Sequence, residues 1–347
     1  MNVTKLDGII SGFEFLLTNC SIGPVEMPAP EIDEWLKEQG VETSLSLPQR
    51  EPLEISLPGV SVGDSIRPVD DLYHVLERLK FERTARVTAY LNINGPDIDS
   101  VEKAQKVADD LCHLLSVAQG RVVQWVGADI LDENGGVLDS HHYGRVTKSF
   151  HQWTPIEDAL NSVELKNFIE QCYPIYVERR NPFRLNQGLI GAYLDAKTEG
   201  DYIETRAVKL AVALEMMKDV FIEHPECQTG EYVVVPEVFE AICDSRRWRS
   251  LNRRSVGHIL RKLFAYIGVK LPGREMDMFI ASRNSLVHRG RFYADTATEE
   301  QKAELEPLPS AKDEFCFMVS VLDRVYLKMV GHSGRYYDVR THSIEML

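Results

Sequence analysis

The sequence predicts an α+β domain over residues 1–155, followed by an all-α helical bundle over residues 156–347. Stretches of β-forming residues fill the first half and alternate with proline-rich segments. The second half carries long apolar patterns spaced by three and four residues, which are typical of amphipathic helices. A chain of 347 residues is long enough for two domains. We expect the first domain to sense a ligand or regulate the second.

The first half contains strand-like segments and one clear helix. The helical pattern places Val101, Ala104, Val107, Leu111 and Leu114 on one face, which favours packing on a sheet. The tetrapeptide ENGG predicts a turn, so the segment after it is expected to pair back as a hairpin. The expected elements are strands over 10–19, 51–57, 85–95 and 121–132, a helix over 99–118, a turn over 133–136 and a returning strand after it.

The second half reads as helical throughout. Pro174 is expected to end the first helix and Gly290 to end the sixth. The helices are expected over 156–174, 184–198, 201–223, 234–245, 255–268, 274–290 and 312–330. The third is expected to be central, with a core stripe of Ile203, Ala207, Leu210, Leu214, Met217 and Phe221, widened by Val208, Ala211 and Val212. The last helix has Phe315, Met318, Leu322, Val325 and Met329 as its core face.

Composition indicates an ordinary globular protein, with 44% hydrophobic and 27% charged residues. It contains no run of about 18 apolar residues, so no membrane partner is expected. The first residues lack the basic and apolar segments of a signal peptide. Six scattered cysteines without a CxxC pair fit a reducing compartment. We therefore expect a cytoplasmic protein.

Charge is divided unevenly along a chain whose net charge is −14. Residues 1–155 hold 13 Lys+Arg and 24 Asp+Glu, which gives a net charge of −11. Residues 156–347 hold the other 26 Lys+Arg and 29 Asp+Glu, which gives a net charge of −3. Contact with phosphate is therefore expected in the second half.

The segment IASRNSLVHRGRF, residues 280–292, combines apolar and cationic residues on one expected helix. Its buried line is expected to run through Met276, Ile280, Arg283 and Val287, with Phe279 beside it. A buried and unpaired arginine would cost several kcal/mol, so Arg283 needs a partner or an open cleft. Under a structural interpretation, Arg283 pairs with a core carboxylate such as Glu215 and His288 caps the helix end.

Under a functional interpretation, the same residues bind a substrate and take part in its reaction. Arg283 offers a fork to phosphate, Asn284 can orient a neighbouring group, and His288 can transfer protons near neutral pH. These residues suit RNA cleavage without metal, in which a ribose 2′-OH attacks its own 3′-phosphate. One copy of the motif has a single histidine, whereas two copies facing each other in a symmetric dimer would supply a general base and a general acid.

The Arg283-Asn284-x-x-x-His288 pattern near the end of a helix resembles the signature of the HEPN family. The helix RAVKLAVALEMM with Glu215, the phrase SRNSLVHRGRF and the closing helix followed by GRYYD resemble its Apea-like branch, found in ApeA-type anti-phage proteins. This resemblance covers residues 157–340 well and the first half loosely. It implies a homodimer or higher homo-oligomer through the helical bundle, RNA as the partner, no cofactor, and a toxin-like role in defence. Carried over, Arg283 binds phosphate, Asn284 orients and His288 transfers protons. Other HEPN domains only bind nucleotides or assemble complexes, and this second role stays open.

A basic stretch precedes the motif, at residues 245–262, with seven Lys/Arg and no acid. It is expected to follow an RNA backbone while Trp248 stacks on a base. Alternatively, it is a solvated face or pairs with the acidic first half and holds the enzyme inactive. The residues expected to contact RNA are Arg246, Arg247, Trp248, Arg249, Arg253, Arg254, Arg289 and Arg291.

His141, His142, Asp139 and His151 raise the question of a metal site. Adjacent residues on a strand point to opposite faces, so His141 and His142 are not expected to share an ion. The motifs GxGxxG, GxxxxGK[ST], HExxH and GxSxG are absent from the sequence. The usual support for nucleotide folds, zincins and α/β hydrolases is therefore missing, and no metal is expected.

Overall fold

A computed structural model describes residues 12–18, 53–57, 60–68, 87–94, 100–142, 154–156, 162–197, 201–224 and 256–347, with residues 75 and 98. Contacts divide the chain into two units. The first comprises Met1–Ser149 and Ile156–Pro174, and the second comprises Phe150–Pro155 and Ile175–Leu347. The described part thus combines an antiparallel sheet with helices, as the sequence predicts at this level.

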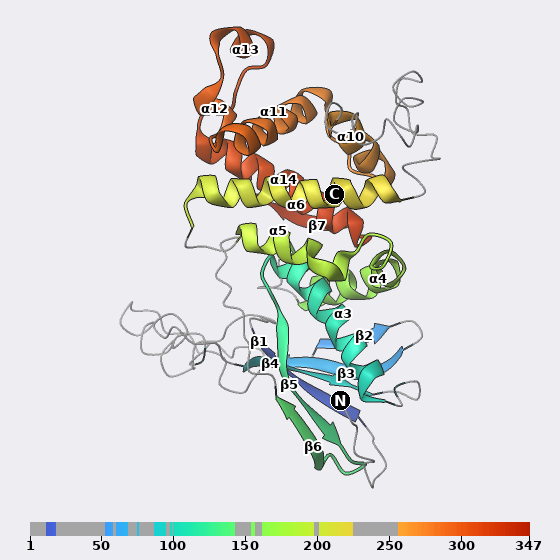
Figure 1. Cartoon of the computed structure of the whole chain (residues 1–347). Helices are drawn as coiled ribbons and strands as arrows, with labels where there is room; N and C mark the ends of the chain where they lie inside the picture. Colours follow the sequence, from blue (N-terminus) through green and yellow to red (C-terminus); the bar gives the residue numbers. More distant parts are fainter. Residues whose placement is uncertain are drawn as a thin grey trace, which may run out of the picture. The chain divides into compact units, whose positions relative to one another are not determined.

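The first unit is built on an antiparallel sheet in the order β2-β3-β4-β1-β5-β6 (Figure 1). The central strand β1 pairs with β4 on one side and β5 on the other, so strands far apart in sequence become neighbours. Phe15 and Leu17 of β1 are fully buried, and alternation of inward and outward residues fixes this register. The strands are β1 (Gly12–Thr18), β2 (Leu53–Leu57), β3 (Val60–Pro68), β4 (Val87–Ile93), β5 (Gln124–Leu131) and β6 (Val137–His142).

The helix α3 (Val101–Gln119) packs against β1, β4 and β5. Ser100 caps its first turn by accepting a hydrogen bond from the Lys103 amide, and Gly120 ends it at a φ of 64°. This helix, the strands expected at 10–19, 51–57, 85–95 and 121–132, and the β5–β6 hairpin are confirmed. Strand β3 is not among the expected strands, because GDS interrupts its apolar alternation.

The second unit is organised around α6 (Ile203–Glu223), which packs against α5, α10, α11 and α14 (Figure 1). The central position expected for this helix is confirmed, and so is the buried face of the last helix. The remaining helical segments are α4 (Ser162–Arg179, shared between the units), η1 (Leu185–Leu189), α5 (Ile190–Lys197), α10 (Val256–Ile267), α11 (Gly273–Arg289), α12 (Tyr293–Thr296), α13 (Glu299–Glu304) and α14 (Ala311–Met329). The helix expected at 234–245 lies outside the described residues.

Pro174 lies inside α4, so the prediction that it ends the helix is wrong. A proline in a helix interior costs about 3 kcal/mol, because it removes one backbone hydrogen bond and crowds the preceding turn. Its ring faces solvent, whereas Phe168, Cys172 and Tyr176 around it are buried. Burial of this apolar face outweighs the local cost and carries the helix to Arg179.

The second half is not entirely helical, because β7 (Arg335–Asp338) and β8 (Ser343–Met346) form a hairpin after α14. Strands of four residues carry too little periodicity to be recognised in sequence. Two residues expected in core stripes are also exposed: Val212 at 47% and Val287 at 41%. None of the helices in the described residues is long and apolar enough to cross a bilayer.

A fully buried polar cluster joins α5 to α14. Lys197 donates to both carboxylate oxygens of Asp323 at 2.8 and 3.0 Å, and Tyr193 donates to the same carboxylate. Burial raises the pKa of Asp323 and lowers that of Lys197, although each partner opposes the shift of the other. The Tyr193 ring stacks on Tyr326 at 4.2 Å between centroids. The cluster therefore ties two core helices together through one carboxylate.

Because several tyrosines are buried, we expect the protein to lose stability at alkaline pH. Burial raises the pKa of Tyr193, Tyr326 and Tyr336 above the ordinary value of 10.0. The folded state keeps these protons while the unfolded state loses them, so their stabilisation is complete below pH 10 and falls as the pH rises. The loss is about 1.4 kcal/mol per pH unit for each tyrosine. The lowered pKa of Lys197 acts in the opposite direction only up to its ordinary value of 10.5.

Urea unfolding at pH 9 and at pH 11 measures this loss. Tyr326→Phe removes one of the titrating groups and is expected to make the pH dependence shallower, although it also removes the 2.9 Å hydrogen bond to the Leu189 carbonyl. Equal unfolding free energies at the two pH values would contradict the prediction.

Candidate functional site

Helix α11 carries the Arg-Asn-x-x-x-His motif and is held by α6 and α10. It ends as expected at Gly290, whose φ is 65° and whose amide donates to the Leu286 carbonyl at 2.9 Å. A Cβ on Gly257 of α10 would lie 2.7 Å from a side-chain carbon of Ile280, so the two helices approach closely there. Met276, Phe279 and Leu286 are buried on the inner face, which fixes the rotation of α11.

Arg283 is buried, with 7% of its surface exposed, and its guanidinium is held on two sides. Its Nη2 forms an ion pair with Glu215 Oε1 of α6, and its Nη1 donates to the Asn284 side-chain oxygen at 2.7 Å. The pairing with Glu215 that the structural interpretation expected is therefore present. Glu215 also accepts from Lys218 at 2.7 Å, and Lys218 contacts Asp219 at 3.2 Å.

His288 and Asn284 are both exposed on the outer side of α11. They lie at positions i and i+4 and so share a face, whereas Arg283 and His288 lie at positions i and i+5, which turns them about 140° apart. His288 makes no hydrogen bond or ion pair with the residues described, so it does not cap the helix. The structure brings Arg283, Asn284 and Glu215 together and leaves His288 open to solvent.

Helix α14 fixes the turn that follows the motif through hydrogen bonds. The fully buried Glu314 of α14 accepts hydrogen bonds from the backbone amides of Tyr293 and Ala294 at 2.9 and 2.8 Å. Thr296 bonds the Ser285 hydroxyl at 2.7 Å, and its carbonyl accepts from Arg289 at 3.1 Å. Arg289 and Arg291 are exposed, so both can meet an anion at the end of α11 that carries His288.

The other expected RNA contacts, Arg246, Arg247, Trp248, Arg249, Arg253 and Arg254, lie outside the described residues. At the end of the same basic stretch, Arg261 forms an ion pair with Asp277 of α11, while Lys262 is buried. In the first unit, His141 contacts Asp139 at 3.5 Å; His151 and the side chain of His142 are not described. Within the described ranges, no group of three His, Cys, Asp or Glu residues is placed to hold a metal.

The sequence interpretation missed Lys218, a buried cation that shares Glu215 with Arg283. A signal for it was available, because Glu215 and Lys218 lie three residues apart and therefore meet on a helix surface. It also missed the polar cluster of Tyr193, Lys197 and Asp323, because Asp323 lies 126 residues from Lys197 in sequence.

No known protein family model matches this chain, and no curated protein or solved structure matches it either.

Proposed function

We propose that the chain is a metal-independent endoribonuclease that acts as a dimer of its helical units. The proposal is carried by the exposed His288 and Asn284 on one face of α11, beside the exposed Arg289 and Arg291. In each cleavage, one histidine takes the proton of a ribose 2′-OH while the 2′-oxygen forms a bond to the neighbouring phosphorus. The bond from phosphorus to the 5′-oxygen breaks, and a second histidine protonates that oxygen. The products are a 2′,3′-cyclic phosphate and a 5′-hydroxyl.

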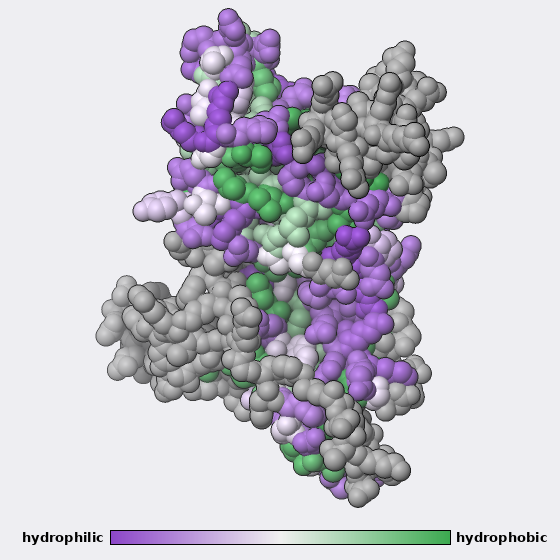
Figure 2. Space-filling view, viewed as in Figure 1, coloured by the Kyte–Doolittle hydropathy of each residue, from purple (hydrophilic) through white to green (hydrophobic). Residues whose placement is uncertain are grey.

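A second copy would supply the second histidine, and the surface around the motif suits such pairing. Val212 lies one turn before Glu215 on α6, and Val287 lies one turn after Arg283 on α11; both are exposed. Figure 2 shows apolar residues gathered on the second unit at the level of α6, between hydrophilic areas. Exposed apolar surface rimmed by polar residues is a common feature of protein interfaces.

The burial of Arg283 favours a second candidate, a non-catalytic HEPN module that binds nucleotides or assembles complexes. An arginine committed to Glu215 and Asn284 has little surface left for phosphate. In the ribonuclease, Arg283 therefore acts in its observed state by holding Asn284, and Arg289 and Arg291 meet the phosphate. A role in anti-phage defence rests on the resemblance alone.

His288→Ala is expected to reduce RNA cleavage at least about 100-fold, because proton transfer contributes a factor of that order or more. The fold is expected to be unchanged, since surface changes of this kind cost at most about 0.5 kcal/mol. Total cellular RNA is incubated with purified protein in EDTA, and 2′,3′-cyclic phosphate ends are counted. His141→Ala, on the partly exposed strand β6, is the matched histidine control.

Expression of wild type in a bacterial host is expected to arrest growth, and expression of His288→Ala is not. Sedimentation of the wild type is expected to give a dimer or a higher oligomer. Intact RNA with a folded wild-type oligomer would contradict the ribonuclease and leave the non-catalytic module, and a monomer that cleaves would contradict the shared site.

A further inference from the structure

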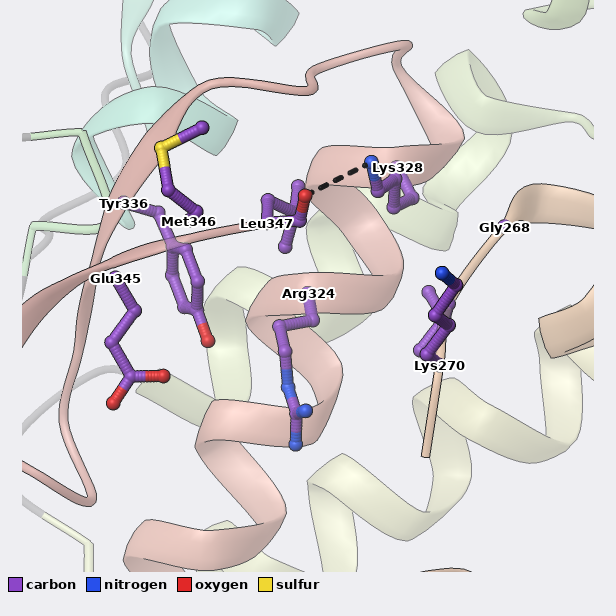
Figure 3. A pocket seen from close by; sticks show the side chains of 9 residues that line it. Gly268, Lys270, Arg324, Lys328, Tyr336, Glu345, Met346 and Leu347 are labelled. Atoms are coloured by element: carbon purple, nitrogen blue, oxygen red, sulfur yellow. Dashed lines mark hydrogen bonds between the residues drawn. The ribbon is translucent and has the colours of Figure 1, made fainter. Parts of the chain in front are cut away.

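A pocket of about 410 Å³ opens in the second unit, on the side of α14 that faces the terminal hairpin (Figure 3). Three segments form it: residues 268–270 after α10, the C-terminal half of α14, and the β7–β8 hairpin. Its volume lies in the range of small-molecule sites, roughly 300–1,000 Å³. None of the motif residues of α11 lines it, so it is distinct from the proposed ribonuclease site.

Cations outnumber carboxylates around this pocket, although the chain as a whole carries a net charge of −14. Lys270, Arg324 and Lys328 line it, against one acidic side chain, that of Glu345. Arg324 and Lys328 lie four residues apart and share one face of α14, while Lys270 comes from a separate segment (Figure 3). Two elements thus present positive charge to one space.

The hydrogen-bonding capacity of these cations is largely unused by the described residues. Lys270 is exposed and makes no ion pair or hydrogen bond with them. Lys328 reaches the Leu347 carbonyl oxygen at 3.5 Å, a long contact. Arg324 approaches Glu275 at 4.0 Å, and its buried Nε has no hydrogen-bond partner in the described part. A buried donor without a partner is unfavourable unless a ligand or water satisfies it.

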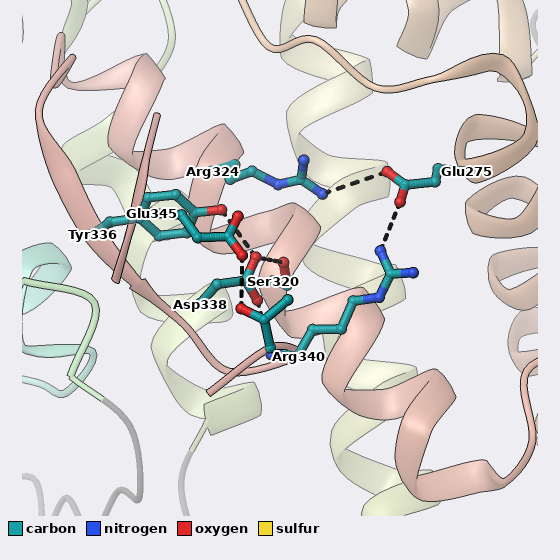
Figure 4. A network of polar contacts seen from close by, with 8 residues as sticks. Glu275, Ser320, Arg324, Tyr336, Asp338, Arg340 and Glu345 are labelled. Carbon is teal, nitrogen blue, oxygen red and sulfur yellow. Dashed lines mark hydrogen bonds and ion pairs between the residues drawn. The ribbon is translucent and has the colours of Figure 1, made fainter. Parts of the chain in front are cut away.

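A polar network keeps Arg324 available and fixes the hairpin (Figure 4). Glu275 is bound closely by Arg340, at 2.6 Å, and only loosely by Arg324. Asp338 accepts hydrogen bonds from Tyr336 at 2.9 Å, from Ser320 at 2.8 Å and from the Arg340 amide at 2.8 Å. These contacts anchor β7 to α14, so the wall of the pocket is formed before any ligand arrives.

We propose that this pocket binds a phosphate monoester of about mononucleotide size. A phosphate carries up to two charges and three acceptor oxygens, which suits three cationic donors better than a carboxylate does. The Glu345 carboxylate can accept a hydrogen bond from a sugar hydroxyl, and Val269 and Met346 offer apolar surface to the remainder.

Isothermal titration of the full chain with AMP, inorganic phosphate and adenosine tests the proposal. AMP is expected to bind, inorganic phosphate to bind more weakly, and adenosine to bind weakest, because it lacks the phosphate. Lys270→Gln and Lys328→Gln are each expected to weaken AMP binding about tenfold. Lys302→Gln on α13 neutralises an exposed lysine outside the pocket and is expected to change nothing.

Lys270 is exposed, so Lys270→Gln is expected to fold like the wild type, which circular dichroism checks. No binding of AMP or phosphate to folded wild type at millimolar concentration would overturn the proposal. Equal AMP affinity in the three lysine variants would also overturn it, and tighter binding of phosphate than of AMP would overturn the assigned ligand size. These outcomes are independent of RNA cleavage, because His288→Ala retains the pocket.

Discussion

Asp323→Asn is expected to lower the free energy of unfolding by about 4 kcal/mol, the largest effect on stability that we predict. The substitution keeps the shape of the side chain and removes its charge. Lys197, with 1% of its side chain exposed, then remains as a buried ammonium without a counter-ion. Restoring an equivalent partner requires water to enter the core between α5 and α14, which close packing opposes.

Chemical denaturation of four proteins measures this effect: wild type, Asp323→Asn, Lys197→Met and the double variant. Among the described residues, Lys197→Met leaves the buried Asp323 carboxylate with the Tyr193 hydroxyl as its remaining side-chain partner, so a similar cost is expected. The double variant is expected to be more stable than the sum of the single effects predicts, because neither charge is then left alone. Strict additivity would contradict a coupled pair.

Lys209→Met provides the matched control on the surface of α6. Lys209 contacts Asp195 at 2.9 Å and Asp201 at 2.7 Å, so its distances resemble those of Lys197. Its side chain is 31% exposed, and water can replace its partners. Its loss is therefore expected to cost less than about 1 kcal/mol. A comparable cost for the two lysines would show that distance, rather than burial, sets the energy.

The sequence predicts those parts of the fold that depend on local pattern. The stripe on α6, the apolar face of α3 and the αL ending of α11 at Gly290 follow from spacing and residue type. The expectation that Pro174 ends a helix fails because the cost of this proline is local, whereas the burial that outweighs it is tertiary. The partnership of Lys197 with Asp323 spans 126 residues, and no pattern within either helix reveals it.

The candidate site likewise has features that follow from local pattern and features that depend on tertiary packing. Arg283 stands out in the sequence because it interrupts an apolar line, and a buried arginine needs a partner, so the structural interpretation pairs it with a core carboxylate such as Glu215. Periodicity alone, however, treated Val287 as buried, whereas it is 41% exposed. A helix of 17 residues with a broad apolar face does not define which edge of that face reaches solvent. The exposed edge depends on how α6 and α10 pack against α11, and the sequence of α11 alone does not determine that packing.

Glu215→Ala is expected to destabilise the second unit by about 3 kcal/mol, because it leaves the buried Arg283 without a counter-ion. Lys218 also loses a partner but retains Asp219 at 3.2 Å. Arg283→Met is expected to lower the free energy of unfolding by less than Glu215→Ala does. The Glu215 side chain is 26% exposed and still has Lys218 at 2.7 Å, so its charge stays compensated. Thermal or urea unfolding monitored by circular dichroism measures this asymmetry, with Glu299→Ala on the exposed Glu299–Lys302 pair of α13 as the control near zero.

The Arg283→Met variant also separates the two candidate functions, because it removes the motif cation at the smaller cost in stability. If Arg283 holds Asn284 for catalysis, cleavage by Arg283→Met falls steeply at temperatures where the protein remains folded. Glu215→Leu combined with Arg283→Met is then expected to recover stability without recovering cleavage, since a well-packed apolar pair can replace a buried ion pair. Cleavage that returns with stability in the double variant would contradict this expectation, and Arg283 would then serve the fold alone. An equal loss of stability in Glu215→Ala and Arg283→Met would instead show that Lys218 does not stabilise the carboxylate, contrary to the geometry of α6.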